Sequence, residues 1–224
     1  MKVSVLQFPG TNCELDTVYA FEKLGAKTEI VWHKNETLPA DTDLLVVAGG
    51  FSYGDYLRSG AIAKFSPVMK AVKEYAKNGG KVLGICNGFQ VLTESGLLPG
   101  ALKRNNGLHF ISKHHHLRVE NNDNIFLEKL NKGDVVNIPI AHHDGNYYID
   151  EDGLKDLKAN NQILLTYSDE NGDVKNPNGS VDSIAGVCNI EKNVFGLMPH
   201  PERAMESILG SDDGVKMLEG FLAS

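Results

Sequence analysis

Residues 82–92, with the sequence VLGICNGFQVL, pass from the pattern of a buried strand to that of a helix with no loop between them. Gly84 and Gly88 stand two residues before and two residues after Cys86. This G-x-nucleophile-x-G spacing is typical of a sharp strand-to-helix turn that presents its central side chain at the top of a sheet. Glycine is needed on both sides because a Cβ there would crowd the turn or block the approach of a substrate.

Cys86 is the candidate nucleophile of this turn. The N-terminus of the following helix carries partial positive charge, which favours the thiolate over the thiol. The alternative is a buried structural cysteine, which is the interpretation we keep for Cys13 and Cys188. For Cys86 the flanking glycines and the strand–helix junction favour catalysis.

Strand and helix patterns alternate along the first two-fifths of the chain. We expect strands at 2–8, 28–32, 44–48 and 81–85, and helices at 16–24, 59–77 and 87–95. This alternation predicts an α/β fold, with an open, mostly parallel sheet and helices on both faces. Functional residues of such sheets gather at the carboxyl ends of the strands, where Gly49-Gly50 and Cys86 both stand.

The remainder of the chain predicts a different kind of sheet. Short strands are expected at 117–120, 135–140, 146–149 and 163–167, separated by polar turns. A surface loop at 169–180, a hairpin-like pair of strands at 183–189 and 194–198, and a last helix capped by Ser211 follow. These segments predict an antiparallel or mixed section added to the parallel core. No linker or repeat divides the sequence, so we expect a single domain over residues 1–224.

The composition restricts the partners and the compartment. A net charge of −7 argues against nucleic acid or an anionic membrane as the main partner. Three cysteines at unrelated spacings do not form a disulfide framework, and a working thiolate needs a reducing compartment. The sequence has neither a signal-peptide pattern nor an apolar run of membrane-spanning length, so we expect a cytoplasmic protein.

His200 and Glu202 are the candidate partners of the thiol, because a cysteine nucleophile needs a base and the base needs a group that orients it. Pro199 and Pro201 bracket the histidine, so this segment is extended rather than helical. Residues two apart in an extended chain point the same way, which lets the carboxylate bind one ring nitrogen while the other faces the sulfur. A structural loop histidine and a helix N-terminal charge would explain each residue alone. Together with Cys86, they favour a catalytic triad.

Acyl chemistry on a thiol also needs donors for the oxyanion. The backbone N–H of Asn87, the residue after the nucleophile, provides one. A second donor could come from the glycine-rich turn at residues 49–55, which follows a parallel strand. The alternative for this turn is a phosphate cradle, but it has neither the Lys-Ser/Thr of a P-loop nor a dinucleotide fingerprint.

A group of histidines offers a possible metal site. His114 and His116 would share one face of a strand, and a zinc site with His109, His142 or His143 is conceivable. No acidic or cysteine ligand stands at a persuasive spacing nearby. We therefore favour a polar, exposed strand edge and expect no bound metal.

The motifs together resemble the class I (triad) glutamine amidotransferases. Residues 49–58, 84–90, 96–101 and 196–203 resemble, more closely, the glutaminase subunits of phosphoribosylformylglycinamidine synthases. The resemblance runs from residues 7–13 to the last helix, which is essentially the whole chain. It implies the flavodoxin-like fold of the class I amidotransferases.

The resemblance also implies a reaction. Glutamine binds beside the turn, partly through Gln90, and the Cys86 thiolate attacks its side-chain amide. The Gly50–Phe51 region and the Asn87 N–H hold the oxyanion. His200 gives a proton to the leaving ammonia, and water then releases glutamate from the thioester.

The resemblance further implies partners in a complex. Ammonia passes to a large, ATP-dependent synthetase subunit, which converts formylglycinamide ribonucleotide to formylglycinamidine ribonucleotide in de novo purine synthesis. A small accessory subunit completes the complex. We expect no cofactor on this chain, since ATP and Mg²⁺ are used by the synthetase subunit.

Two positions depart from the family pattern. His143-Asp144 stand where Gly-Glu is expected, and Ser112-Lys113 stand where Cys-Arg is expected. Both pairs lie where glutamine specificity or partner docking can be tuned.

Two alternative functions stay open. A stand-alone cysteine hydrolase of related α/β fold usually carries histidine directly after the cysteine, where this chain has Asn87. A non-catalytic regulatory subunit would not need the intact Cys, His and Glu.

Overall fold

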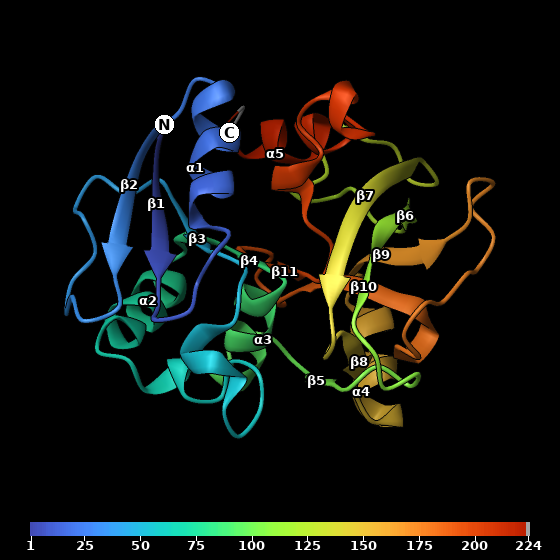
Figure 1. Ribbon diagram of the computed structural model, residues 1–224, viewed down its shortest axis with the longest axis horizontal. Helices are drawn as coiled ribbons and strands as arrows, with labels where there is room; N and C mark the ends of the chain where they lie inside the picture. Colours follow the sequence, from blue (N-terminus) through green and yellow to red (C-terminus); the bar gives the residue numbers. More distant parts are fainter. Residues whose placement is uncertain (223–224) are drawn as a thin grey trace.

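One sheet crosses the molecule in the computed structural model, which describes residues 1–222 (Figure 1). In this part of the chain the sheet has nine strands, in the order β2-β1-β3-β4-β11-β10-β9-β6-β7. The strands are β1 (Lys2–Gln7), β2 (Lys27–Trp32), β3 (Leu44–Val47), β4 (Lys81–Ile85), β6 (Ile111–Val119), β7 (Val135–His142), β9 (Ile163–Ser168), β10 (Ile184–Cys188) and β11 (Val194–Leu197). A separate two-stranded sheet pairs β5 (Ala101–Lys103) with β8 (Asn146–Tyr148).

The sheet changes from parallel to antiparallel at β11. Strands β2, β1, β3, β4 and β11 pair in parallel. From β11 the sheet continues through β10, β9, β6 and β7, and each of these pairings is antiparallel. The α/β class with a mixed sheet is therefore confirmed. The expected antiparallel section is a direct continuation of the parallel strands.

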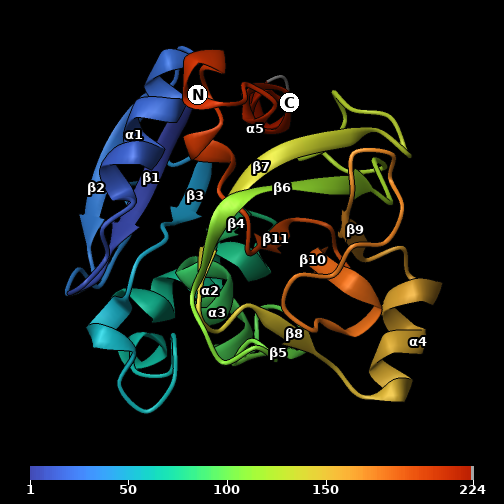
Figure 2. The same ribbon diagram turned by 45° about the vertical axis from the view of Figure 1, so that its right-hand side comes forward.

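Helices cover both faces of the sheet (Figure 2). Helices α1 (Glu14–Lys23) and α5 (Gly214–Leu222) lie on one face, and α2 (Val68–Lys77) and α3 (Asn87–Glu94) lie on the other. Neighbouring residues of β11 show this alternation. Phe195 packs against Phe221 of α5 with ring centroids 5.6 Å apart, whereas a Cβ on Gly196 would lie 2.2 Å from Phe89 of α3. The strands are therefore buried on both sides, as the continuous apolar run of β3 requires.

The predicted helix at 59–77 is wrong over its first half. The structure places only a short 3₁₀ turn there, and α2 begins at Val68. Ser66 precedes Pro67 and is extended, with φ −61° and ψ 144°. The proline ring disfavours the helical conformation for the residue before it, so a helix cannot pass through this pair.

A further helix, α4 (Glu151–Ala159), was not predicted. Its signal is nevertheless present in the sequence, because the Asp150 side chain accepts a hydrogen bond from the Gly153 N–H at 2.8 Å as an N-cap. Short 3₁₀ helices occur at η1 (Ser52–Asp55), η2 (Ala63–Phe65), η3 (Val181–Ser183), η4 (Pro201–Arg203) and η5 (Ser207–Leu209).

The other expected elements are present with small changes in their ends. Strand β6 starts six residues before the predicted strand at 117–120 and reaches back through the histidine run. The hairpin-like pair is confirmed as β10 and β11. Among residues 1–222, no helix combines the length and the apolar character needed to cross a bilayer. The single-domain interpretation stays a prediction.

Candidate active site

The carboxyl ends of three neighbouring parallel strands bring the predicted site residues to one edge of the sheet. β4 lies between β3 and β11, with Gly84 opposite Val47 and Ile85 opposite Leu197. The chain leaves β4 directly into Cys86, and it leaves β11 toward His200 two residues after Met198. Two segments more than a hundred residues apart in sequence therefore end side by side.

Cys86 occupies the strand-to-helix turn in a left-handed conformation, with φ 51° and ψ −106°. Its side chain is only 5% exposed. The thiol donates to the Ala141 carbonyl oxygen, with a sulfur-to-oxygen distance of 3.6 Å. The first turn of α3 begins at the next residue, so the sulfur stands at a helix N-terminus as expected.

Gly84 and Gly88, which flank Cys86, are required because neighbouring atoms leave no room for a Cβ at either position. A Cβ on Gly88 would lie 1.8 Å from the Val47 carbonyl oxygen, and a Cβ on Gly84 would lie 2.6 Å from a methyl carbon of Leu92. Both contacts are shorter than any real carbon contact. The glycines therefore allow α3 to lie directly on β3 and β4.

His200 and Glu202 form a buried pair. The Nδ1 atom of His200 lies 2.6 Å from Oε1 of Glu202, and both side chains are 2% exposed or less. The Nε2 atom of His200 has no hydrogen-bond partner among residues 1–222. Burial opposes protonation of this ring, but the Glu202 carboxylate and the Cys86 sulfur outweigh it and raise the pKa of His200 well above its usual value. This arrangement stabilises the protonated imidazole of His200.

Cys13 lies against the same pair, a contact that sequence analysis missed. Ligand atoms of Cys13, His200 and Glu202 all lie within 4.8 Å of one another. The Arg203 guanidinium donates to the Cys13 sulfur at 3.2 Å, and its Nε atom donates to Asp16 at 2.9 Å. Because this positive charge already faces the sulfur, the group is better suited to pack against the His200–Glu202 pair than to hold a metal cation. Only the fold joins Cys13 to the other residues, so no local pattern could indicate the contact.

The third cysteine has a different environment. Cys188 is fully buried in β10, and burial raises the pKa of its thiol to about 11. A thiol with this pKa stays protonated near neutral pH. Cys188 thus agrees with the structural interpretation.

The candidate oxyanion donors differ in their availability. The Asn87 N–H lies in the first turn of α3, where backbone donors have no helical partner. Gly50 has a φ of 141°, and a Cβ there would lie 2.6 Å from the Asn12 nitrogen, so only glycine fits. The Phe51 N–H donates to the Gly10 carbonyl oxygen at 2.9 Å. The role of Gly50 and Phe51 as donors stays a prediction, since the Phe51 N–H is bound elsewhere in this conformation.

Gln90 is almost fully buried beside the turn, with both ends of its amide in use. Its Oε1 accepts from Asn87 Nδ2 at 2.8 Å, and its Nε2 donates to the Asp144 carbonyl oxygen at 2.7 Å. A direct contact between the Gln90 side chain and glutamine stays a prediction.

A pocket opens beside the glycine-rich loop at residues 49–55, and its lining does not include Cys86. It is lined by Phe51, Gly54, Asp55, Leu57, Arg58, Leu102, Lys103, Arg104, Leu108, His109, Phe110, His143 and Asp144. Burial and the neighbouring Asp144 raise the pKa of Asp55 to about 6, although a hydrogen bond from Ser59 opposes this. The pocket combines carboxylates and guanidinium groups, which suits a small zwitterion.

The histidine residues do not gather into a metal site. Within the described residues, the group of possible metal ligands does not include His114 or His116. His115 is buried and contacts the Lys175 carbonyl oxygen at 2.8 Å. His142 is buried, accepts from Asn178 at 3.0 Å, and has a pKa lowered to about 3 by burial and by His200. It is therefore neutral at physiological pH.

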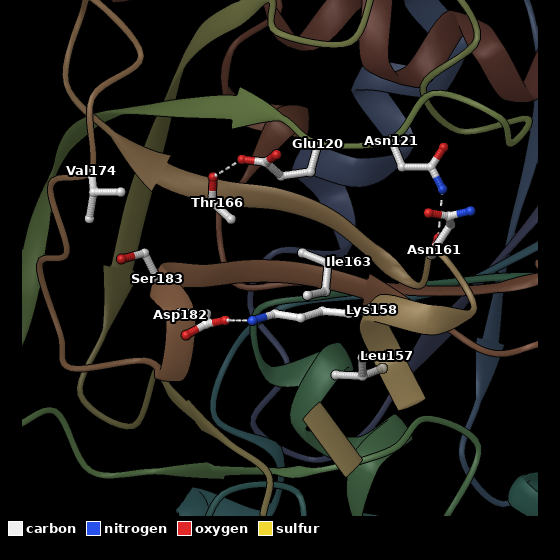
Figure 3. A pocket seen from close by; sticks show the side chains of 10 residues that line it. All are labelled: Glu120, Asn121, Leu157, Lys158, Asn161, Ile163, Thr166, Val174, Asp182 and Ser183. Carbon is white, nitrogen blue, oxygen red and sulfur yellow. Dashed lines mark hydrogen bonds and ion pairs between the residues drawn. The ribbon is translucent and has the colours of Figure 1, made fainter. Parts of the chain in front are cut away.

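Another hollow is lined by residues of α4, β9 and η3 and by the segment that follows β6 (Figure 3). Its polar side chains bind one another. Lys158 pairs with Asp182 at 2.5 Å, and Thr166 donates to Glu120 at 2.7 Å. It brings together no nucleophile and base, so we place the chemistry at the turn.

The sheet, the strained cysteine turn and the His–Glu pair define a glutamine amidotransferase. The chain belongs to the CobB/CobQ-like glutamine amidotransferase family, whose domain matches residues 1–213. Phosphoribosylformylglycinamidine synthase subunit PurQ of Sulfurimonas denitrificans is 81% identical over 222 residues, which are 99% of each chain. The PurQ subunit of Wolinella succinogenes is 64% identical over 221 residues, also 99% of each chain. The structure of PurLQS from Thermotoga maritima contains a chain 42% identical to this one, with a TM-score of 0.89, over 99% of this chain and 97% of that chain.

Proposed function

We propose that this protein is the glutaminase subunit of a phosphoribosylformylglycinamidine synthase. The observation that carries the proposal is the buried His200–Glu202 pair at the carboxyl end of β11, beside the Cys86 turn that ends β4. The similarity to PurQ subunits over nearly the whole chain supports the particular reaction.

In this mechanism, the Cys86 sulfur attacks the side-chain amide carbon of glutamine. Negative charge develops on the amide oxygen, where the Asn87 N–H supplies one donor. The Phe51 N–H supplies the second after it leaves the Gly10 carbonyl oxygen that it binds in this conformation. His200 gives its proton to the leaving nitrogen, so ammonia departs and a γ-glutamyl thioester remains. Glu202 holds the ring in position and stabilises its charged form.

The second half of the reaction reverses the role of the imidazole. Neutral His200 takes a proton from water, which attacks the thioester carbon. The carbon–sulfur bond breaks, glutamate leaves, and the thiolate is restored. Ammonia is the product that the partner subunit consumes.

The partners follow from the same proposal. A large synthetase subunit uses ATP to join the ammonia to formylglycinamide ribonucleotide, so the whole complex is a carbon–nitrogen ligase. A small accessory subunit completes it, and this chain binds no cofactor, metal, nucleic acid or membrane of its own. The cytoplasm is the compartment that keeps Cys86 reduced.

The decisive experiment uses Cys86→Ala in the reconstituted complex. We expect glutamine-dependent synthesis to be abolished, while synthesis from added ammonia stays at the wild-type rate. Cys188→Ala is the matched control and should retain both activities. Loss of both activities in the Cys86 variant would assign Cys86 a structural role.

A labelling experiment separates the alternatives. A glutamine-analogue diazoketone should alkylate Cys86, and free glutamine should block the reaction. Labelling without protection by glutamine would favour a cysteine hydrolase with another substrate. No labelling in the presence of the synthetase would favour a non-catalytic regulatory subunit.

A further inference from the structure

The side chains of Asn87 and Gln90 are buried in the first turn of α3, directly after the nucleophile. They are 1% and 5% exposed. Their three-residue spacing places them next to each other on one side of the helix. The proposed reaction uses the backbone N–H of Asn87 and gives its side chain no part.

These two amides connect three segments of the chain. The Ser52 N–H donates to Asn87 Oδ1 at 2.9 Å, Asn87 Nδ2 donates to Gln90 Oε1 at 2.8 Å, and Gln90 Nε2 donates to the Asp144 carbonyl oxygen at 2.7 Å. The series therefore links the glycine-rich loop, the cysteine turn and the loop after β7. We call these three hydrogen bonds the amide relay.

The direction of the amide relay is fixed by its two ends. A backbone N–H can only donate and a backbone carbonyl can only accept. Asn87 must therefore present its oxygen to Ser52 and its nitrogen to Gln90. Gln90 must present its oxygen to Asn87 and its nitrogen to Asp144. Neither side chain can be turned over without placing two acceptors or two donors together.

The amide relay acts on the segment that holds the predicted oxyanion donors. Ser52 directly follows Phe51, so the hydrogen bond to Asn87 attaches this loop to the cysteine turn. On its other side the loop is held by Phe51 N–H to Gly10 at 2.9 Å and by Tyr53 N–H to Pro9 at 2.6 Å. The position of the loop relative to the sulfur is thus set from both sides.

We propose that the side chains of Asn87 and Gln90 are positioning residues. They hold the glycine-rich loop, the cysteine turn and the loop at residues 143–145 at fixed distances from one another, and in this way they align the two sides of the oxyanion hole. This inference rests on the proposed glutaminase reaction. It is separate from the expectation that Gln90 binds glutamine directly, for which the amide keeps a second N–H and a second lone pair beside the two bonds of the amide relay. A positioning role affects the transition state more than substrate binding.

The test exchanges one donor for an acceptor without changing the size of the side chain. Asn87→Asp places a carboxylate oxygen against Gln90 Oε1, and Gln90→Glu places one against the Asp144 carbonyl oxygen. Gln162→Glu is the matched control, because Gln162 is also buried and its Nε2 donates to the Cys188 carbonyl oxygen at 2.8 Å, in β10. Each variant is measured in the complete synthase complex, with thermal unfolding recorded alongside.

We expect both relay variants to lower the glutamine-dependent kcat by about 10- to 100-fold, as loss of alignment at an oxyanion hole does. The KM for glutamine should change less than about threefold, and ammonia-dependent synthesis should not change. The control should lose stability but keep its kcat. Alkylation of Cys86 by iodoacetamide, which needs no oxyanion hole, should keep its wild-type rate in Gln90→Met, which breaks the same hydrogen bonds without adding a charge near the thiol.

Other outcomes overturn the inference in distinguishable ways. A raised KM with an unchanged kcat would make Gln90 a direct ligand of glutamine. Wild-type kinetics in both relay variants would leave the amide relay with no catalytic role. Should Gln90→Glu fail to fold, Gln90→Met removes the same hydrogen bonds without adding charge and must show the same loss of kcat. Failure of the proposed function is distinguishable, because the wild-type complex would then show no glutamine-dependent synthesis.

Discussion

The Cys86 backbone is held in a conformation that a residue with a Cβ rarely adopts. A left-handed φ of 51° at a non-glycine residue costs on the order of 1–3 kcal/mol. Hydrogen bonds on both sides of the residue oppose this cost, since its N–H donates to the Leu197 carbonyl oxygen at 2.8 Å and its carbonyl oxygen accepts from the Gln90 N–H at 3.2 Å. This conformation lets helix α3 begin at the very next residue, Asn87.

The raised pKa of Asp55 makes the free energy of unfolding depend on pH. The pKa of Asp55 is about 6 in the folded protein against an ordinary value of 3.8, because burial and Asp144 disfavour its charge. Between these two values the folded chain keeps a proton that the unfolded chain has lost. The free energy of unfolding therefore falls as the pH rises from about 4 to about 6. Asp55→Asn removes this contribution.

Between pH 4 and pH 7, we expect the free energy of unfolding of Asp55→Asn to rise by about 1 kcal/mol relative to that of the wild type. This figure allows for solvent screening of a partly exposed group. Urea unfolding of both proteins across this range measures the difference. Two curves that stay parallel over the range would show that Asp55 titrates normally.

Among single helices, strands and turns, the features that depend on a local sequence pattern were predictable, and those that depend on tertiary contacts were not. Cys86 and the His200–Glu202 pair were predictable because each depends on a few consecutive residues. The helix expected from 59 was wrong because its apolar spacing continues across Ser66-Pro67, where the backbone cannot be helical. The contact of Cys13 with the His200–Glu202 pair and the hydrogen bond between Asn87 and Ser52 join distant segments, so neither pattern nor spacing indicates them.

Gly88 provides a prediction about the fit of α3 on the sheet. Gly88→Ala would place a Cβ 1.8 Å from a backbone oxygen of β3, which cannot move without disrupting the strand. We expect a loss of more than about 3 kcal/mol in the free energy of unfolding, as for severe overpacking of a core. Gly107→Ala is the control, since its Cβ would meet only the exposed His109 ring, at 3.1 Å. Equal stability of the two variants in urea would contradict the packing argument.

At the scale of the whole molecule, the site is built to work with a partner. Cys86 is nearly buried, and the Phe51 N–H is bound to Gly10. Leu57 and Leu108, which line the pocket, have exposed fractions of 91% and 71%. An isolated glutaminase that ran continuously would waste glutamine, and nothing among residues 1–222 resembles an ATP site.

We therefore expect weak glutaminase activity from the chain alone and at least about tenfold activation by the synthetase subunit. Release of glutamate, measured with and without the synthetase and the accessory subunit, checks this expectation. Cys86→Ala, assayed in the same mixtures, corrects for background hydrolysis. The same rate with and without the partners would mean that the resting site is already competent.

The pairing of β4 with β11 also governs when the enzyme can first act. The nucleophile is made early on the ribosome, whereas the base arrives only when the chain is nearly finished. All of the antiparallel half must emerge before β11 can be inserted beside β4. For the proposed reaction, we therefore expect a nascent or truncated polypeptide that ends before β11 to release no ammonia, although it carries the thiol.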